Sequence, residues 1–371
     1  MKVMTILGTR PEIIRLSRVI PLLDEACDHV LVHTGQNFHP GLSDVFFSEL
    51  GVRDPDLYLG VKGDSFAQQV GMLLERVEQV FLDAHPDRLL ILGDTNSGLC
   101  SIVARRLGIP TYHMEAGNRC YDDRVPEEVN RRIIDHCSTV LMPYTHRSKE
   151  NLVREGIERA RIFVTGNPIK QVLDHYSDRI GASDVLDRMG LDEERFFLVT
   201  MHRAENVDDE GTLRELVTAL GRLHDTYELP VVCSLHPRTR SKIEGMGIDI
   251  DRAGLVFTEP MGFFDFVRLE RAAWCLLTDS GTVQEEACLF GKPSVTIRET
   301  TERPETIEAG SNILSGTRSD RIIQTVSIVV REPGSWVAPV EYEVDDVAEP
   351  VRRIVLGHRL EDPVEQRWLS R

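Results

Sequence analysis

The sequence lacks the cysteine arrangement of a disulfide framework or of a metal site. Its seven cysteines are odd in number and dispersed over 371 residues, and no two of them form a C-x-x-C pair. Most lie inside apolar runs, as in Leu99-Cys100 and Trp274-Cys275-Leu276. Because a disulfide framework needs paired, regularly spaced cysteines, this pattern is typical of buried, reduced thiols.

Targeting and membrane-spanning segments are also absent. The chain opens directly into an apolar run at residues 3–7, with no basic region before it and no cleavage site after it. No apolar run approaches the ~20 residues that a membrane-spanning helix needs. We therefore expect a cytoplasmic protein with no membrane partner.

The chain carries fewer positive than negative charges. Forty-three Lys and Arg residues stand against sixty Asp and Glu residues, which gives a formal net charge of −17. Such a field repels polyanions, so we expect no nucleic-acid partner. A small anionic ligand is still compatible with this charge, because a few arginines in a cleft override the global sign locally.

Two familiar ligand motifs are missing as well. The twelve histidines show neither an H-E-x-x-H motif nor paired Cys/His spacing, so we expect no metal. The G-x-G-x-x-G fingerprint of dinucleotide-binding folds is absent too. What remains is an ordinary globular composition, with 41% hydrophobic and 28% charged residues, and a length that predicts two domains.

Short apolar runs alternate with stretches of helical period along the chain. In the stretch 65–82, for example, Phe66, Val70, Leu73 and Val77 share one helical face. The strands that we predict are residues 3–7, 30–33, 89–92, 111–114, 140–142, 162–164, 196–200, 231–235, 255–257, 275–277 and 294–297.

This alternation predicts an α/β protein, because strands connected through helices form parallel sheets that are covered on both faces. The scheme restarts in the second half, so we predict two doubly wound, Rossmann-like domains joined near residues 166–168. Ligands of such sheets bind beyond the carboxyl ends of the strands. The active cleft is therefore expected between the two domains.

The first candidate site is the turn at residues 8–12, which follows a strand and opens a helix. Gly8 permits a tight turn, Pro11 suits the first helical position, and the free amides of a helix start attract an anion. Arg10 and Arg15 add positive charge. A purely structural turn with exposed arginines explains the same residues, so both interpretations stay open.

Three carboxylates follow predicted strands or begin a predicted helix. Asp94 and Glu115 come after apolar strands, and Glu127 lies in the first turn of a helix that Pro126 opens. Each alone is explained by helix capping or by a salt bridge. Their common face favours a cluster, in which one pKa rises and supplies a general acid beside a general base. Glu128 is the expected solvated or salt-bridged neighbour.

The second half offers another anion site in the turn at residues 279–286. Ser280, Gly281 and Thr282 present amides and hydroxyls at the start of a helix, and Glu286 lies about one turn further in. An anion fits this helix start, and Glu286 suits the hydroxyls of a ribose. A capped helix with an acidic first turn is the alternative.

Three further residues of the second half complete this set. His202 directly follows a strand and suits a phosphate, although a lone loop histidine is more often structural. Arg298 and Arg303 would reach a nucleotide or form salt bridges. The residues alone leave these alternatives open.

Taken together, these segments resemble the non-hydrolysing UDP-N-acetylglucosamine 2-epimerases. The resemblance runs in order along nearly the whole chain, and this ordered series is highly specific. Its segments are residues 8–12, 34–36, 93–95, 115–117, 126–131, 165–167, 202–203, 279–286 and 301–304.

The resemblance implies a fold of the GT-B type, with two Rossmann-like domains that face across a cleft. Residues 1–168 would form the domain with the catalytic carboxylates, and residues 169–355 the UDP-binding domain. A tail of residues 356–371 would return to the first domain, and the amphipathic stretch 344–356 is the candidate helix for this return. A homodimer is expected from the same resemblance.

The resemblance also implies the chemistry. The C2 proton of a sugar nucleotide is barely acidic, so the family eliminates UDP in the anti sense to give a 2-acetamidoglucal. It then reprotonates C2 on the other face and adds UDP back, which converts UDP-GlcNAc to UDP-ManNAc without a cofactor. Acid–base groups contribute only ~10²–10⁴-fold each. Stabilisation of the departing UDP supplies much of the rest.

By position, Asp94, Glu115 and Glu127 match the acid–base residues of the family, and His202 matches its catalytic or phosphate-contacting histidine. Phe266 matches the residue that packs near uracil. The resemblance further implies a set of residues that hold UDP or the sugar, namely Arg10, Arg15, Ser280, Gly281, Thr282, Glu286 and Arg303. It does not say which carboxylate removes the proton. The expected pathway is cell-surface polysaccharide synthesis.

The sequence departs from the family pattern at several positions, so more than one sugar substrate is compatible with it. Arg15 stands where many members have lysine, Thr282 replaces a second glycine, and Met261 replaces a glutamine. The short segment 117–124 and the residues 34–37 resemble the UDP-2-acetamido-2,6-dideoxy-L-talose 2-epimerases, which make UDP-N-acetyl-L-fucosamine. A hydrolysing 2-epimerase, a GT-B glycosyltransferase and a non-catalytic sensor are the remaining alternatives.

Overall fold

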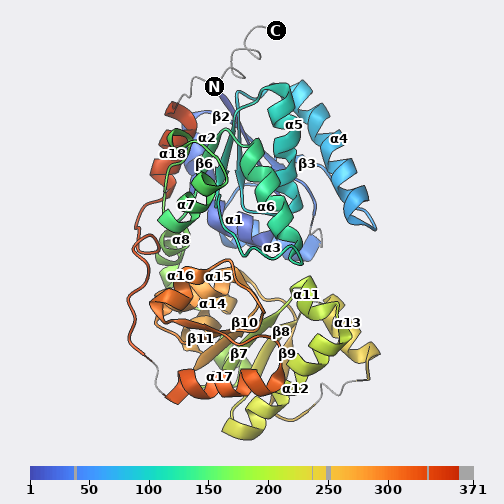
Figure 1. Ribbon diagram of the computed structural model, residues 1–371, viewed down its shortest axis with the longest axis vertical. Coiled ribbons are helices and arrows are strands. Elements are labelled where there is room, and N and C mark those ends of the chain that lie inside the picture. Colours follow the sequence, from blue (N-terminus) through green and yellow to red (C-terminus); the bar gives the residue numbers. More distant parts are fainter. Residues whose placement is uncertain (37–39, 236, 248–251, 332–333, 359–371) are drawn as a thin grey trace. The chain divides into compact units, whose positions relative to one another are not determined.

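Two parallel six-stranded sheets organise the chain (Figure 1). The computed structural model describes residues 1–36, 40–235, 237–247, 252–331 and 334–358. The predicted tail therefore lies outside the described residues from residue 359 onward, as does residue 37 of the segment 34–37.

The first sheet has the strand order β3-β2-β1-β4-β5-β6, and all its pairs are parallel. This is the Rossmann order, in which two halves of the sheet run outward from the central pair β1 and β4. Its strands are β1 Lys2–Leu7, β2 Asp28–His33, β3 Leu57–Tyr58, β4 Arg88–Leu92, β5 Thr111–Met114 and β6 Val140–Met142.

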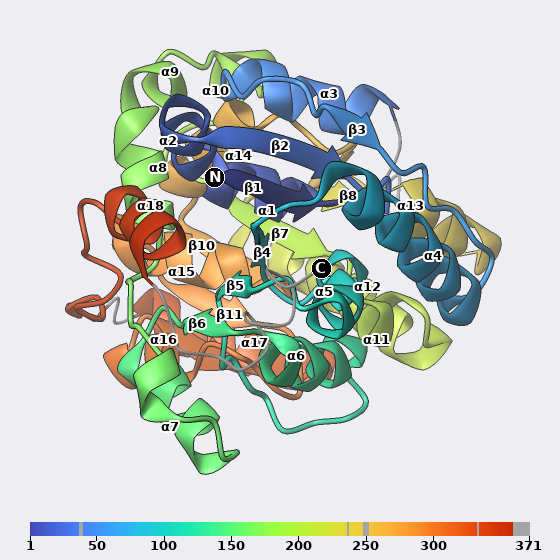
Figure 2. The same cartoon turned by 90° about the horizontal axis from the view of Figure 1, so that it is seen from above.

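Helices cover both faces of the first sheet. Figures 1 and 2 show α4, α5 and α6 together on one face and α2 and α18 on the other, whereas α7 lies beside the edge strand β6. The helices are α1 Arg10–Leu16, α2 Val19–Ala26, α3 Pro40–Glu49, α4 Phe66–Ala84, α5 Cys100–Leu107, α6 Pro126–Cys137, α7 His146–Arg154, α8 Ile169–His175 and α18 Ala348–Gly357. Because helices lie on both sides, every residue of β4 and β5 is buried.

The second sheet has the order β12-β11-β10-β7-β8-β9, again with parallel pairs. Counted from β7, this is the same order as in the first sheet. Its strands are β7 Phe197–Met201, β8 Val231–Leu235, β9 Leu255–Thr258, β10 Cys275–Thr278, β11 Ser294–Thr296 and β12 Asn312–Leu314.

The helices of the second sheet alternate with its strands. They are α9 Ser177–Gly181, α10 Val185–Met189, α11 Ala204–Val207, α12 Glu210–Tyr227, α13 Pro237–Gly245, α14 Phe263–Ala272, α15 Gly281–Phe290, α16 Pro304–Ala309 and α17 Ser319–Arg331. Figure 1 shows α12 and α17 on one face of this sheet and α14 and α15 on the other. The prediction of two doubly wound, Rossmann-like α/β domains is confirmed.

Helix α4 illustrates why the periodic stretches fold as predicted. Ser65 caps its start, because the Ser65 hydroxyl accepts the backbone N–H of Gln68. Leu73, Val77 and Phe81 are buried along one face and join the core of the sheet. The helix ends where His85 adopts a left-handed φ of 48°.

Three short segments differ from the predicted strands. Strands β3 and β12 were not predicted, because segments of two and three residues are too short to show a period. The predicted strand at 162–164 is wrong. Only an isolated bridge joins Ile162 to Leu141 there, directly after a 3₁₀ turn at Arg159–Arg161.

The chain divides into two compact units. Unit 1 comprises Met1–Val172 and Glu341–Arg371, and unit 2 comprises Leu173–Val340. These limits differ from the predicted limits at 168 and 356. The return to unit 1 begins at Glu341, whose carbonyl oxygen accepts the N–H of Asn167 at 2.8 Å. Residues 341–343 carry no apolar period, so the sequence pattern marks the return only from the later amphipathic stretch.

Candidate functional site

Both sheets reverse their strand order between two neighbouring strands. The reversal lies between β1 and β4 in unit 1, and between β7 and β10 in unit 2. Ligands of open α/β sheets bind beyond the carboxyl ends of the strands at such a point. Gly8 and Asp94 follow β1 and β4, whereas His202 and Asp279 follow β7 and β10. Asp94 and His202, which the sequence predicts as site residues, therefore follow strands at the points of reversal.

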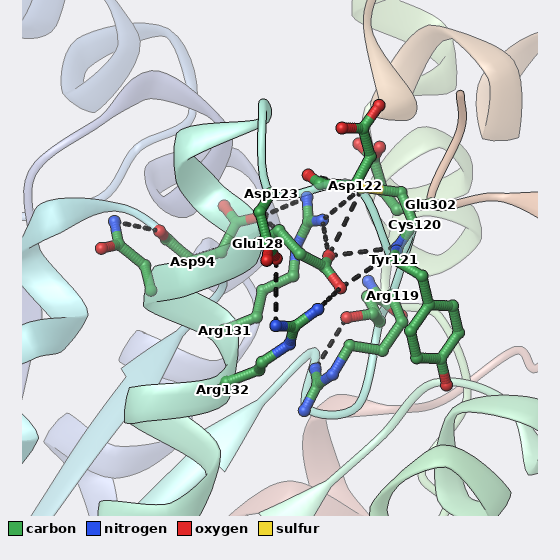
Figure 3. Close-up of polar contacts among 12 residues, drawn as sticks. Asp94, Arg119, Cys120, Tyr121, Asp122, Asp123, Glu128, Arg131, Arg132 and Glu302 are labelled. Atoms are coloured by element: carbon green, nitrogen blue, oxygen red, sulfur yellow. Dashed lines mark hydrogen bonds and ion pairs between the residues drawn. The ribbon is translucent and has the colours of Figure 1, made fainter. Parts of the chain in front are cut away.

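Asp94 lies between the end of β4 and helix α6. The Nε and Nη2 atoms of Arg131 approach its Oδ2 at 2.8 and 2.7 Å. The amide of Asn130 donates to its backbone carbonyl at 3.0 Å. The side chain keeps an exposed fraction of 26%, so a ligand can reach it. Figure 3 shows Arg131 bound to Asp94.

Glu115 directly follows β5, the strand next to β4. Its backbone has a φ of +65°, which is the left-handed region and costs about 1–3 kcal/mol for a residue other than glycine. Three side chains contact its carboxylate, namely Arg15 at 3.4 Å, the Tyr144 hydroxyl at 3.4 Å and the Asn118 amide at 3.2 Å. Backbone strain of this kind clusters at functional sites and supports a role for Glu115.

Gly117 makes the sharp turn after Glu115 possible. Its φ is +80°, and a Cβ at this position would lie 2.3 Å from the carbonyl oxygen of Ser148. No other residue combines this conformation with so little space. The conformation of Gly117 and its close approach to Ser148 thus both restrict the turn that carries Glu115.

Glu127 lies in the first turn of α6, and the same helix supplies the Arg131 and Asn130 that bind Asp94. Because residues three and four apart lie on the same face of a helix, Glu127 is within about one turn of these contacts. The structure therefore brings Asp94, Glu115 and Glu127 into one part of unit 1.

The neighbouring Glu128 is salt-bridged rather than solvated. Its side chain is fully buried, and its carboxylate binds Arg131 at 2.8 Å and Arg132 at 3.3 Å. It also accepts the backbone N–H groups of Cys120 and Tyr121 at 3.1 Å each. Although burial by itself raises the pKa of Glu128, these N–H groups and Arg131 lower it below its ordinary value.

A buried polar network supports the turns that carry Asp94 and Glu115. The His113 ring binds the carbonyl oxygen of Gly93 at 2.8 Å and the carboxylate of Asp135 at 2.9 Å. Asp135 also accepts the N–H of Gly117 at 3.2 Å and pairs with Arg119 at 2.8 Å. A single helix residue, Asp135, thus connects both strand ends.

The turn after β1 is organised by Glu12, which is also buried. Its carboxylate accepts the N–H of Gly8 at 3.0 Å and the hydroxyls of Thr9 at 2.7 Å and Thr95 at 3.2 Å. Burial raises the pKa of Glu12 to about 7, in spite of these hydrogen bonds. Glu12 therefore joins the β1 turn to the residue that follows Asp94.

The two arginines predicted beside this turn differ in their surroundings. Arg10 is partly exposed, and its guanidinium lies 5.7 Å from the centre of the Phe46 ring. Arg15 has an exposed fraction of only 1%, contacts Glu115 and lies over the ring of Tyr144 at 5.3 Å. Arg15 thus has a carboxylate partner in unit 1, which the sequence did not indicate.

In unit 2, His202 is held by a buried aspartate. Its Nδ1 lies 3.0 Å from Asp279, which also accepts the backbone N–H groups of His202 and Arg203 at 2.8 and 2.9 Å. Although burial by itself raises the pKa of Asp279, His202 and these N–H groups lower it to about 2. The imidazole is half exposed, so its other ring nitrogen is available to a ligand.

The other predicted residues of unit 2 gather at the start of α15. Ser280 is the N-cap, Gly281 is the first helical residue, and Thr282 follows. Arg303, the N-cap of α16, binds Glu285 on α15. A Cβ on Gly281 would lie 3.4 Å from the Arg303 guanidinium, so the two helix starts are close together.

The last three candidates are Glu286, Phe266 and Arg298. Glu286 is buried on α15, and its carboxyl group lies next to that of Glu270 on α14. Phe266 lies partly buried on α14 against the apolar cluster beneath it. Arg298 has an exposed fraction of 1% and pairs with Glu205 at 3.1 Å and Glu302 at 2.9 Å, which confirms its salt-bridge interpretation.

The sequence did not predict the contacts of Arg131, His113, Asp135 and Arg119. One signal in α6 could have found part of this set. Glu128, Arg131 and Asp135 recur at spacings of three and four, so three charged residues occupy the buried face of an amphipathic helix. Charges on a buried face need partners, and the partners here are the strand-end turns.

None of the seven cysteines, all of which lie in the described part of the chain, forms a disulfide. Among the residues that the structure describes, no group of three or more His, Cys, Asp or Glu side chains is arranged to hold a metal ion. In the same described part of the chain, no helix combines the length and the apolar character needed to cross a bilayer.

Comparison with known proteins gives a consistent result. A family model described as UDP-N-acetylglucosamine 2-epimerase matches residues 23–353. A UDP-N-acetylglucosamine 2-epimerase of Methanocaldococcus jannaschii is 38% identical over 349 residues, which cover 91% of this chain and 95% of the relative. A UDP-2,3-diacetamido-2,3-dideoxy-D-glucuronate 2-epimerase of Pseudomonas aeruginosa is 38% identical over 331 residues, covering 88% and 91%.

Solved structures agree with the sequence matches. The Methanocaldococcus jannaschii UDP-GlcNAc 2-epimerase, solved in complex with UDP-GlcNAc and UDP, superimposes with a TM-score of 0.91 at 37% identity. The match covers 95% of this chain and 99% of that structure. A glycosyltransferase of lipopolysaccharide biosynthesis matches with a TM-score of 0.56 at 13% identity over 99% and 98% of the two chains. At that identity the likeness shows the GT-B type of fold alone.

Proposed function

Because the chain belongs to the UDP-N-acetylglucosamine 2-epimerase family of isomerases, we propose that it inverts C2 of UDP-N-acetylglucosamine and so forms UDP-N-acetylmannosamine. The family model spans most of the chain, and a similar protein has been solved with UDP-GlcNAc and UDP bound. Both support a UDP-sugar as the substrate.

One observation carries the proposal at the level of chemistry. Asp94 and Glu115 follow adjacent parallel strands, and Glu127 begins the helix that binds Asp94. A reaction that removes a proton from one face of C2 and returns it to the other needs at least two such groups. A glycosyltransferase does not need this cluster, because it makes no exchange of a carbon-bound proton.

The proposed reaction proceeds by elimination and re-addition. A carboxylate takes the C2 proton, the C2–H electron pair becomes the C1=C2 double bond, and the C1–O bond breaks to release UDP. A second carboxyl group returns a proton to the opposite face of C2, and a UDP oxygen attacks C1. Atoms and electrons balance without an oxidant, so the scheme requires no redox cofactor.

The contacts of the carboxylates guide the assignment of the base and the acid. Asp94 is partly exposed, and the Arg131 guanidinium holds its carboxylate from one side, an arrangement that suits a proton acceptor. We assign Asp94 the removal of the C2 proton in one direction. Glu127 or Glu115 then holds the proton that returns to the other face.

Unit 2 offers the groups that would hold UDP. The start of α15 presents backbone N–H groups at Ser280 and Gly281, which suit a phosphate. His202, oriented by Asp279, would donate to the diphosphate as charge develops on the departing UDP. Glu286 and Phe266 are assigned to the ribose and the uracil.

The identity of the sugar is the more specific part of the proposal. The relatives described above are named for UDP-N-acetylglucosamine and for a diacetamido-dideoxyglucuronate. Neither name favours the 6-deoxy-L-sugar that acts as substrate of the enzymes whose segments residues 34–37 and 117–124 resemble. The homodimer and the cytoplasmic location stay predictions.

Incubation with UDP-GlcNAc in the absence of any acceptor tests the activity. We expect an equilibrium mixture of UDP-GlcNAc and UDP-ManNAc, read by proton NMR. Release of free N-acetylmannosamine and UDP would show a hydrolysing enzyme instead. Turnover of UDP-2-acetamido-2,6-dideoxy-L-talose or the diacetamido-glucuronate, with none of UDP-GlcNAc, would overturn the proposed substrate.

A further inference from the structure

One arginine connects the proposed proton acceptor with a buried acid on the other side. Arg131 lies on α6 with its side chain only 4% exposed. Its Nε and Nη2 atoms both approach Oδ2 of Asp94, at 2.8 and 2.7 Å. Its Nη1 donates to Glu128 at 2.8 Å. Figure 3 shows the guanidinium between these two carboxylates.

Glu128 extends the connection to the segment 117–124. It accepts the backbone N–H groups of Cys120 and Tyr121 at 3.1 Å each, and no part of its side chain is exposed. Tyr121 has a φ of +55°, a conformation that other contacts must hold in place. A continuous chain of charge-assisted hydrogen bonds thus runs from this segment through Glu128 and Arg131 to Asp94.

Other charged side chains lie close to this contact. Glu115 lies near Gly93, where a Cβ would be 3.7 Å from its carboxylate. Glu12 contacts the adjacent Thr95, and Glu127 lies one turn before Arg131 on α6. Arg15, another cation of this region, contacts Glu115. Arg131 therefore lies directly against Asp94, whereas Arg15 lies against Glu115.

We propose that Arg131 is a positioning residue that fixes the orientation of the Asp94 carboxylate, and that Glu128 couples this contact to the segment 117–124. The inference rests on the proposed function, in which Asp94 exchanges the C2 proton. It goes further, because it assigns the orientation of that acid to the pair Arg131 and Glu128 on α6 and connects it with the conformation of a neighbouring segment.

Substitution of Arg131 tests the inference through its separate effects on kcat and KM. Arg131→Met removes both the charge and the fork, so kcat is expected to fall ~10²-fold, the loss of one acid–base contribution. The KM for UDP-GlcNAc should stay within about threefold, because the loss concerns the proton-transfer step and not the binding of the substrate. The Kd for UDP, measured by calorimetry, should stay within about twofold, because the residues assigned to the phosphates, the ribose and the uracil lie in unit 2.

Arg131→Lys and Arg132→Met are the matched comparisons. Lysine keeps the charge but not the planar fork, so kcat should fall less than in Arg131→Met and still lie below the wild-type value. Arg132 lies next along α6 and contacts Glu128 at 3.3 Å and Asp123 at 3.0 Å. Since these contacts do not include Asp94, Arg132→Met should keep the wild-type kcat.

The role of Glu128 is tested by a double-mutant cycle. Glu128→Gln should lower kcat in the same direction as Arg131→Met. The double variant should lose less than the product of the two single losses, because both act through one connection. Fully multiplicative losses would overturn the coupling between Glu128 and Arg131.

The outcomes separate this inference from the proposed function. A wild-type kcat in Arg131→Met, or a loss that lies entirely in KM, would overturn the positioning role. If Arg131→Met does not fold, Arg131→Lys decides, and a wild-type kcat without the planar fork would contradict the proposal. A fully active Asp94→Asn would instead remove Asp94 from the mechanism and so refute the proposed function.

Discussion

At the scale of single residues, unit 1 stabilises its acids in two different ways. Asp94, Glu115 and Asp135 each contact a guanidinium, from Arg131, Arg15 and Arg119 respectively. Glu12 is bound instead by the Gly8 N–H and by two threonine hydroxyls. Hydrogen bonds without a counter-charge compensate burial incompletely, and burial raises the pKa of Glu12 accordingly.

Replacement of Glu12 by glutamine should change how stability depends on pH. Burial raises the pKa of Glu12 from 4.5 to about 7. Between these values the folded chain holds a proton that the unfolded chain releases, so the stability of the wild type falls as the pH rises through this window. The loss contributed by Glu12 approaches about 3 kcal/mol above the folded pKa. Glu12→Gln does not titrate and should escape this loss.

Urea unfolding from about pH 5 to about pH 8 measures the difference. Relative to the wild type, Glu12→Gln should gain stability as the pH rises. Glu78→Gln, an exposed substitution on α4, is the control and should follow the wild type. Parallel stability curves for the wild type and Glu12→Gln would contradict the assignment.

At the scale of elements, the strand-end turns carry the site, and their residues were predictable because they interrupt apolar runs. Asp94, Glu115 and His202 all follow buried strands, which is a signal that the sequence shows directly. Their partners were less predictable. Arg131 is 37 residues from Asp94 along the chain, and Arg15 is 100 residues from Glu115. Only the sheet order brings such pairs together.

The start of α15 allows a test of the nucleotide-binding assignment. A Cβ on Gly281 would lie 3.0 Å from the Glu302 carboxylate, which must move by a few tenths of an ångström, and 3.4 Å from the Arg303 guanidinium, an ordinary contact. Gly281→Ala is therefore expected to weaken UDP binding ~10-fold, while the better helix propensity of alanine preserves the helix. Calorimetric titration with UDP measures this change.

Gly181→Ala is the matched control, because a Cβ there meets nothing within 4 Å. It should bind UDP like the wild type. Wild-type affinity in Gly281→Ala would show that the start of α15 does not hold the phosphates.

At the scale of the whole molecule, one Rossmann strand order is built twice, and the chain then returns to unit 1. The repeated strand–helix alternation made the two-domain α/β fold predictable from the sequence. The point of return was not, because Glu341 is held by a backbone bond to Asn167 and not by an apolar pattern. Helix α18 packs on α2 and buries Val347, Val351 and Val355.

Val351→Asp should therefore destabilise unit 1. Its side chain is fully buried, so an unpaired carboxylate there is expected to cost at least about 3 kcal/mol. Hydrogen-exchange mass spectrometry should show faster exchange in β1, α2 and β2, with unit 2 unchanged. Arg353→Ala, whose side chain is 75% exposed on the same helix, is the control. Equal loss of protection in unit 2 would contradict the division into units.

The most direct test of the central claim is incubation with UDP-GlcNAc in D₂O. The wild-type enzyme is expected to place deuterium at C2 of both UDP-GlcNAc and UDP-ManNAc, because the proton is exchanged through the carboxylates. Asp94→Asn should bind UDP but incorporate no deuterium on the same timescale. Conversion without deuterium at C2, or wild-type incorporation by Asp94→Asn, would contradict proton exchange through Asp94.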